Sequence, residues 1–427
     1  MTPILTLALL SIVLCLLTMP VALALGVSSL VVMLAWPGPP LLLAAQKILN
    51  GMDSFSLLAI PFFLLAAQLM NAADITQRII AVLNAGLGRF RGGLAHVTVG
   101  ANMFLAGISG SSVADAAATG SVMIPAMKRE GYPGGFAAAL TAAAAVCGPI
   151  IPPSIPLVIY GVVAKVSILK LFAAGYVPGV LLGLGLFAYV AWAARRRGFP
   201  MAEAPGMAEI ARRVRHGSLA LLMPVLLVVG IVGGIFTVTE LGAVLVVYAL
   251  AVGFLAYRTL GLRQVPRLVG DVALESANVM FVVGVSSLVA YLVVFHQIPT
   301  ALMQFLGETT DSRIVVLLLF NLVLLVAGMF LDSTPATIIL VPIFLPLARK
   351  YGIDPTHLGL VMVFNLMVGL VTPPVALNLY ITARIAAVPI WRALVEMVPL
   401  FVLLLAILAF VTFAPEAMLW LPRVLGL

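Results

Sequence analysis

Two short polar stretches interrupt long apolar runs in the two halves of the chain, and they hold the residues best suited to chemistry. The first is GISGSS at 107–112, which supplies hydroxyls and is followed one helical turn later by Asp115. The second is LDSTP at 331–335, which supplies Asp332 and two further hydroxyls. Carboxylate and hydroxyl oxygens suit hard cations such as Na⁺. The two stretches therefore predict a site for a cation or a polar substrate.

A broken apolar run follows each polar stretch. The breaks are GPIIPPSIP at 148–156 and GLVTPPVAL at 369–377. Proline lacks an N–H group and clashes with a continuing helix, so the carbonyls of residues 145–151 are expected to lose their helical partners. Freed carbonyls of this kind are natural ligands for Na⁺. In the second copy, Thr372 and Asn378 add side-chain oxygens.

Two simpler interpretations stay open. Asp115 and Asp332 are also suited to capping the helices that follow hairpin turns, and prolines kink many helices without binding an ion. Both features nevertheless recur at the same spacing, which favours an ion site. The two copies align without a gap: Ala106-Gly107 falls on Ala327-Gly328, Pro125 on Pro346, Gly131 on Gly352, Gly148 on Gly369, and Pro152-Pro153 on Pro373-Pro374.

The surrounding sequence is that of a membrane protein. Its residues are 63% hydrophobic and 9% charged, with a mean hydropathy of +1.22, whereas a soluble domain carries roughly a quarter charged residues. Apolar runs of about 20 residues predict spans. The predicted spans are 6–19, 22–36, 55–71, 136–164, 171–194, 219–236, 241–257, 272–295, 357–385 and 393–413; the segments 92–129 and 313–350 are predicted helical hairpins, and 74–89 and 258–271 are predicted interfacial arm helices.

Basic residues gather on one side of this arrangement. Most of the 23 Lys and Arg share that side, namely Arg78, Arg89, Arg91, Lys128, Arg129, Arg195, Arg196, Arg197, Arg212, Arg213, Arg215, Arg258, Arg263, Arg267, Arg384 and Arg392. By the positive-inside rule this side is cytoplasmic, and both termini lie outside. The net charge of +8 is thus a topology signal within a lipid bilayer, and no nucleic-acid partner is needed to explain it.

The predicted topology also orients the repeat. An odd number of predicted spans separates the two hairpins, so the second hairpin enters the membrane from the opposite side. Repeats inverted about an axis in the membrane plane, with paired Gly- and Pro-interrupted segments, are typical of secondary transporters. The predicted fold class is therefore all-α integral membrane, an inverted repeat with two re-entrant helical hairpins and broken helices whose polar tips meet near the midplane.

Four segments resemble the large membrane subunit of TRAP transporters, the tripartite ATP-independent periplasmic systems. They are GISGSSVADAAATGSVMIPAMKREGY at 107–132, GPIIPPSIP with residues 157–161 after it, GGIFTVTELGAV at 233–244, and GIDPTHLGLVMVFNLMVGLVTPPVALNL at 352–379. The resemblance covers nearly the whole chain from residue 53 onward. It implies an elevator-type secondary transporter of the ion-transporter fold, located in a bacterial inner membrane and driven by an inward Na⁺ gradient.

The resemblance also implies partners and a site. The partners are a small membrane subunit and a periplasmic substrate-binding protein, the imported substrate is an organic acid such as a C4-dicarboxylate or sialic acid, and Na⁺ is the coupling ion, with no cofactor. The implied ion and substrate site comprises Ser109, Ser111, Ser112, Asp115, Gly148, Pro149, Asp332, Ser333, Thr334, Asn365, Gly369, Thr372 and Asn378, with Na⁺ held at Ser111, Ser112, Gly148, Asp332, Ser333 and Thr372. The implied moving parts are the transport repeats 92–170 and 313–387; the scaffold comprises 1–91, 171–271 and 272–312, and the C-terminal span is 388–427.

The chain departs from the family pattern at two positions. Val238 stands where the family usually has proline in its TPTE segment, and Ala376 stands where it usually has glycine after the second double proline. The second change affects the predicted site, because alanine resists a positive φ angle.

Two other functions compete with import by a tripartite system. GISG matches the GxSG pattern of rhomboid intramembrane proteases, but His96 lies at the start of the same hairpin and the other histidines lie at span ends or in a loop, so no base is predicted beside Ser109. An enzyme is therefore not expected. A stand-alone Na⁺-coupled carboxylate symporter of the same fold remains the alternative, and it would need no partner.

Overall fold

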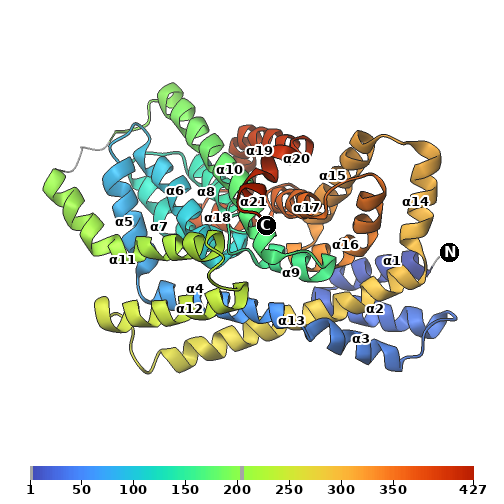
Figure 1. The fold of residues 1–427 in the computed structure, drawn as a ribbon. Coiled ribbons are helices and arrows are strands. Elements are labelled where there is room, and N and C mark those ends of the chain that lie inside the picture. Colours follow the sequence, from blue (N-terminus) through green and yellow to red (C-terminus); the bar gives the residue numbers. More distant parts are fainter. Residues whose placement is uncertain (1–2, 202–205) are drawn as a thin grey trace.

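The computed structural model describes residues 3–201 and 206–427, and its regular structure there is entirely helical (Figure 1). The predicted scaffold segments 1–91 and 171–271 also contain residues 1–2 and 202–205, which lie outside the described residues. Within the part of the chain that the structure describes, seven helices are long and apolar enough to cross a membrane: 55–72, 168–197, 208–231, 238–256, 265–295, 313–330 and 390–413. The chain is accordingly a multi-pass membrane protein.

The N-terminal part is built of short helices. It contains α1 (Pro3–Leu16), α2 (Val21–Ala35), α3 (Leu42–Met52) and α4 (Ala59–Ala72), the last preceded by a 3-10 turn (Phe55–Leu58). The helices α1 and α2 match the first two predicted spans, with 14 and 15 residues. At 1.5 Å per residue they reach only about 21–23 Å, short of the roughly 30 Å hydrocarbon core. Neither is therefore long enough to cross a bilayer upright.

Both predicted hairpins and both predicted helix breaks are present. In the first repeat, α5 (Ile75–Leu87) is the predicted arm helix, α6 (Gly93–Ser109) and α7 (Ser112–Arg129) form the hairpin, and α8 (Gly134–Ala145) and α9 (Ile155–Ala164) are the two halves of the broken helix. In the second repeat, α15 (Arg313–Phe330) and α16 (Ser333–Lys350) form the hairpin, and α17 (Pro355–Gly369) and α18 (Leu377–Ala386) are the broken helix.

The remaining helices connect or follow the repeats. They are α10 (Ile168–Arg197), α11 (Met207–Val232), α12 (Val238–Ala251) with a π-helical turn (Val252–Ala256), α13 (Val265–Phe295), α14 (Ile298–Thr309), α19 (Ile390–Phe413), α20 (Pro415–Met418) and α21 (Trp420–Val424). The prediction of a separate arm helix at 258–271 is wrong, because α13 begins at Val265 and continues without a break into the predicted span. Pro266 starts the helix, and no proline or turn follows it at the predicted boundary.

The helices pack into two groups. The helices α10 and α19 pack against the repeats, with α10 on α6, α9 and α17 and α19 on α8, α17 and α18. The helix α4 packs instead against α12 and α13, and α13 also packs on α2 and α3. Figure 1 shows α4, α12 and α13 along one edge of the molecule and the two hairpins on either side of its centre. The second hairpin touches the edge group, because α16 packs on α13.

Candidate functional site

Both hairpin tips and both helix breaks line one cavity of about 160 Å³. Its lining residues are Gly110, Ser111, Ser112 and Val113 of the first tip, Pro149, Ile155 and Pro156 of the first break, Asp332, Ser333 and Thr334 of the second tip, Met367 and Leu370 at the second break, and Leu64, Glu275 and Val279 of α4 and α13. Six predicted site residues therefore meet here: Ser111, Ser112, Pro149, Asp332, Ser333 and Thr334. The fold thus joins polar stretches that lie far apart in the sequence.

The first tip turns at a glycine that no larger residue fits. Gly110 has φ +60°, and a Cβ atom there would lie 2.8 Å from the Pro153 carbonyl oxygen. Glycine adopts this left-handed conformation without steric cost. Ser111 follows as the N-cap of α7, and its hydroxyl accepts a hydrogen bond from the Ala114 N–H at 3.4 Å. The turn holds the tip directly against the first break.

Asp115 lies behind the first tip with an open oxygen. Its side chain is only 2% exposed, and the Ser109 hydroxyl donates to its Oδ1 at 2.5 Å. Its Oδ2 has no hydrogen-bond partner among the described residues. Gly148 packs on this oxygen, since a Cβ atom at Gly148 would lie 2.4 Å from it. Asp115 does not cap α7, because Ser111 makes that hydrogen bond, and a buried carboxylate with an open position favours a cation partner.

Asn378 links the second repeat to the first hairpin. Its Nδ2 donates to the Ser112 hydroxyl oxygen at 2.5 Å, and both side chains are buried. The Asn378 Oδ1 is buried and has no hydrogen-bond partner among the described residues. An amide oxygen is a good ligand for a hard cation. The first tip therefore holds open oxygens from both repeats.

The second tip presents its carboxylate differently. Asp332 is the N-cap residue of α16, the same place that Ser111 has at α7, as the ungapped alignment predicts. Asp332 is exposed at the cavity, whereas Ser333 and Thr334 are buried beside it. One turn later the residue aligned with Asp115 is Ala336. The second tip therefore places its charge at the cavity surface and carries none at the buried position.

The first break frees fewer carbonyls than the sequence predicts. Turn hydrogen bonds reach the Ala145 carbonyl from the Gly148 N–H at 3.1 Å and the Cys147 carbonyl from the Ile151 N–H at 2.9 Å. The Ser154 hydroxyl donates to the Pro149 carbonyl. No hydrogen bond to the Gly148 carbonyl is present among the described residues. Among the carbonyls of this break without such a bond, Gly148 belongs to the residue that packs directly on the open Asp115 Oδ2.

Three predicted residues of the second break do not line the cavity. The Thr372 hydroxyl donates to the Val368 carbonyl at 2.7 Å. The Asn365 Nδ2 donates to the Oδ1 of Asn321 at 2.7 Å, and Gly369 packs so closely on Gly328 that a Cβ atom would lie 2.4 Å from its carbonyl carbon. The contacts of Asn365 and Gly369 hold the second broken helix against α15. Asn365, Gly369 and Thr372 thus position the second repeat in this structure and make no contact with the cavity.

Sequence reasoning missed one charged residue of the cavity. Glu275 of α13 lines it, and the Gln68 Nε2 donates to the Glu275 Oε2 at 3.2 Å. An ionisable residue inside a predicted span was the available signal, since such residues usually face a pathway. The signal was overlooked because Glu275 lies outside the repeats, only a few residues after the predicted arm helix.

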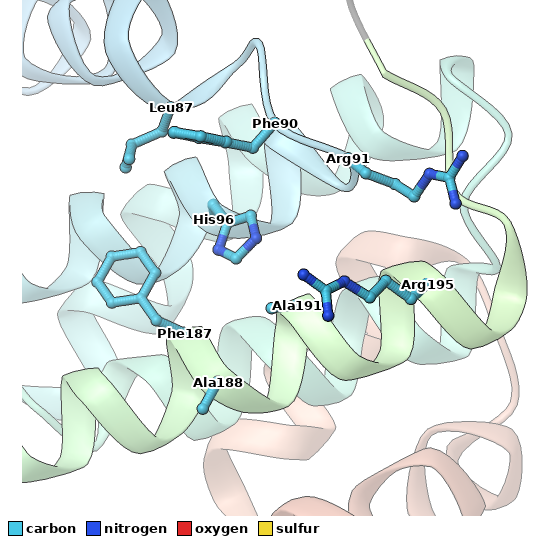
Figure 2. Close-up of a pocket in the computed structure, with 8 residues that line it drawn as sticks. All are labelled: Leu87, Phe90, Arg91, His96, Phe187, Ala188, Ala191 and Arg195. Carbon is cyan, nitrogen blue, oxygen red and sulfur yellow. The ribbon is translucent and has the colours of Figure 1, made fainter.

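A larger hollow of about 480 Å³ lies apart from these residues, between α5, α6 and α10. Figure 2 shows His96 beside Phe187, with the Arg195 guanidinium reaching toward them along α10. The rings of His96 and Phe187 stack with their centroids 5.7 Å apart. No predicted site residue lines this hollow. The only histidine of the first hairpin thus packs on α10.

A sequence model of one protein family matches residues 8–417 of this chain. The family is described as the tripartite ATP-independent periplasmic transporter, DctM component. The chain belongs to this family. It is therefore a TRAP large permease and not an enzyme, which rejects the protease interpretation of GISG.

Named relatives agree with this assignment. The C4-dicarboxylate TRAP transporter large permease protein DctM of Pseudomonas aeruginosa is 38% identical over 404 residues, covering 95% of each chain. The isethionate TRAP transporter permease protein DctMQ of Oleidesulfovibrio alaskensis is 39% identical over 398 residues, which are 93% of this chain and 62% of that one. The large permease thus spans nearly all of the first relative and the greater part of the second.

A solved structure shares the fold. The YdaH transporter of Alcanivorax borkumensis superposes with a TM-score of 0.64, covering 95% of the large permease and 97% of that chain, at 17% sequence identity. Together with the hairpins and broken helices, this likeness confirms the predicted fold class.

Proposed function

We propose that this large permease imports a small organic acid together with Na⁺, by sliding its two repeats past the edge helices of the membrane domain. The observation that carries the proposal is the single cavity at which both hairpin tips and both helix breaks meet. In transporters built of inverted repeats, substrate and coupling ions bind where such discontinuous helices meet. The relatives named for C4-dicarboxylate and isethionate support a small organic anion as the substrate.

The charges around the cavity support cation coupling. Its lining residues include two acidic side chains, Asp332 and Glu275, and none of the described lining residues is basic. An organic anion therefore finds hydroxyls there but no counter-charge. Cations bound at the open oxygens of Asp115, Asn378 and Asp332 would supply it. Each net positive charge that enters adds roughly 2.3 kcal/mol per 100 mV of membrane potential, so excess Na⁺ over substrate charge drives accumulation.

Partners follow from the relatives. The DctMQ relative is longer than this large permease, which covers 62% of it. The remainder of that protein represents what a separate small membrane subunit would supply here. A periplasmic binding protein would deliver the substrate, and the complex would lie in a bacterial inner membrane.

The packing suggests which helices move. The helices α10 and α19 pack on the repeats, so we assign them to the moving body together with the hairpins and broken helices. This differs from the sequence-based division, which placed 171–271 in the scaffold and left 388–427 apart. The edge helices α2, α3, α4, α12 and α13 would form the fixed body.

Uptake into proteoliposomes tests the proposal. Vesicles that hold the large permease with its small membrane subunit should accumulate a radiolabelled organic acid only when the cognate binding protein is outside and an inward Na⁺ gradient is present. Replacing external Na⁺ with choline is the ionic control. Na⁺-driven uptake by the large permease alone, insensitive to the binding protein, would instead establish the stand-alone symporter, and uptake without any Na⁺ gradient would overturn the coupling.

A further inference from the structure

We propose that Glu275 is a charge filter on the fixed wall of the cavity, which keeps an organic anion from entering or crossing unless cations accompany it. The inference rests on the proposed function, because it assumes an anionic substrate and Na⁺ coupling. It assigns a specificity-determining role to a residue outside both repeats.

The position of Glu275 carries the inference. It is the acidic residue that the edge helix α13 contributes to the cavity, and Asp332 of the second hairpin tip lines the same cavity. The cavity holds only about 160 Å³, so a substrate inside it lies close to both walls. The two carboxylates belong to the two bodies that we expect to slide past each other. The cavity is therefore acidic on both its moving and its fixed side.

A hydrogen bond orients the Glu275 side chain within the fixed group. The Gln68 Nε2 of α4 donates to the Glu275 Oε2 at 3.2 Å, and α4 packs on α13. No basic side chain forms a salt bridge with Glu275 among the described residues. A contact within one rigid group keeps the charge in place while the repeats move.

Coulomb repulsion determines how strongly Glu275 is expected to disfavour an unaccompanied anion. Two like charges about 10 Å apart repel each other at an effective dielectric constant of about 20. This repulsion weakens the binding equilibrium constant of the anion on the order of tenfold. Cations at Asp115 and Asp332 offset this repulsion for a loaded site. The same negative wall concentrates cations at the cavity before the acid arrives. Glu275 thereby penalises uptake of the acid without Na⁺.

The test compares Glu275→Gln with a matched control on the same helix. Asp271→Asn removes the same charge one turn earlier, at an exposed position that is not among the cavity-lining residues. In proteoliposomes with the complete transporter, Glu275→Gln should raise uptake in choline, relative to uptake in Na⁺, on the order of tenfold. Asp271→Asn should match the wild type, and Glu275→Asp should restore most of the Na⁺ requirement.

A second measurement keeps the inference testable if Glu275→Gln assembles poorly. Glu275→Cys, with Cys15→Ala and Cys147→Ala in the background, can be modified with a sulfonate or a trimethylammonium thiosulfonate reagent. The negative reagent should restore the Na⁺ requirement, and the positive one should raise choline uptake further. Choline uptake equal to that of the wild type in both experiments overturns the inference. Wild-type uptake that ignores Na⁺ overturns the proposed coupling, and the wild-type measurement alone tells these two failures apart.

Discussion

Asp115 combines burial with an open carboxylate oxygen. The Ser109 hydroxyl satisfies Oδ1, while Oδ2 faces the Gly148 backbone without a hydrogen-bond partner among the described residues. Buried polar groups in native proteins are nearly always paired. A Na⁺ ion bound between this oxygen and the Gly148 carbonyl would satisfy both groups.

Asp115→Asn is the corresponding prediction at the residue scale. The amide keeps the shape of the side chain and removes its charge, so the variant should insert and fold but bind Na⁺ poorly. We expect the Na⁺ concentration for half-maximal uptake to rise at least about tenfold, as for disturbed metal sites. The measurement is a Na⁺ titration of uptake in proteoliposomes. Asp311→Asn, at an exposed position before the second hairpin, is the charge-matched control, and equal Na⁺ dependence in both variants would contradict the site.

Ala376 has the backbone conformation that glycine usually supplies. Its φ is +48° and ψ is 51°, which costs a residue with a Cβ atom roughly 1–2 kcal/mol. The departure from the family pattern noted in the sequence therefore changes the residue and leaves the left-handed geometry in place. Two backbone hydrogen bonds hold this geometry, from the Ala376 N–H to the Thr372 carbonyl at 3.2 Å and from the Tyr380 N–H to the Ala376 carbonyl at 2.9 Å.

Ala376→Gly should therefore be tolerated unusually well. Relief of the left-handed strain offsets the lost burial of one methyl group, about 0.8 kcal/mol, and the extra freedom of the unfolded chain, about 0.4–1 kcal/mol. We expect the free energy of unfolding to change by less than about 1 kcal/mol. Ala142→Gly, buried inside α8, gains no such relief and should cost about 2 kcal/mol. Thermal denaturation of the purified proteins compares the two, and equal losses would argue against a left-handed Ala376.

Which residues could be predicted depends on what the repeat makes visible. Asp332 and Ser111 were recognisable because the same offset places both at a hairpin tip, and both are N-cap residues in the structure. Asn365 belongs to the site that the resemblance implies, yet its side-chain Nδ2 donates to the Asn321 Oδ1 of α15. Glu275 was missed because it has no counterpart in the repeat. Contacts between helices decide such cases, and they are not local in sequence.

At the scale of elements, breaks were easier to predict than boundaries. Proline and glycine act locally on the backbone, so the hairpin turns and the broken helices were correctly placed. The prediction divides the continuous α13 wrongly, because polarity changes after Asp271, in the second turn of the helix, while the backbone continues unchanged. Arg267 and Asp271 lie one turn apart on this helix, and with the polar residues before them they predict a separate interfacial arm at 258–271.

The start of α12 yields a prediction at this scale. Thr237 caps the helix and forms a reciprocal pair with Glu240, whose carboxylate accepts the Thr237 N–H at 2.8 Å. Val238 is the first helical residue, where the family usually has proline. Thr237 has φ −66° and ψ 162°, the extended conformation that a residue before proline requires. Proline at the first helical position loses no intrahelical hydrogen bond.

Val238→Pro should therefore stabilise the large permease by about 0.4–1 kcal/mol, because proline reduces the freedom of the unfolded chain. Val244→Pro, in the interior of the same helix, should cost about 3 kcal/mol or more. The midpoint of thermal unfolding in detergent measures both. Destabilisation by Val238→Pro comparable to that by Val244→Pro would show that α12 does not start at this residue.

At the scale of the whole molecule, an inverted repeat requires the two hairpins to open to opposite sides of the membrane. Arg129 ends α7 and Lys350 ends α16, so they are equivalent residues at the open ends of the two hairpins. If the repeats are inverted, these ends lie on opposite sides of the membrane. Most basic residues, including Arg129, Arg196 and Arg213, are predicted to be cytoplasmic, and Lys350 is then a basic residue on the outer side. Arg129, Arg196 and Lys350 are exposed and Arg213 is half-buried, so each position can be reached by chemical labelling.

Single cysteines at these four positions test the orientation, in a background of Cys15→Ala and Cys147→Ala. In right-side-out vesicles, an impermeant maleimide should label cysteine at Lys350 and leave cysteines at Arg129, Arg196 and Arg213 protected until the vesicles are opened. The Lys350 substitution removes one hydrogen bond, from Nζ to the Met303 carbonyl at 3.0 Å, which is too little to reorient a hairpin. Labelling of Arg129 and Lys350 from the same side would make the repeats parallel. This result would also remove the support that an inverted repeat gives to sliding transport.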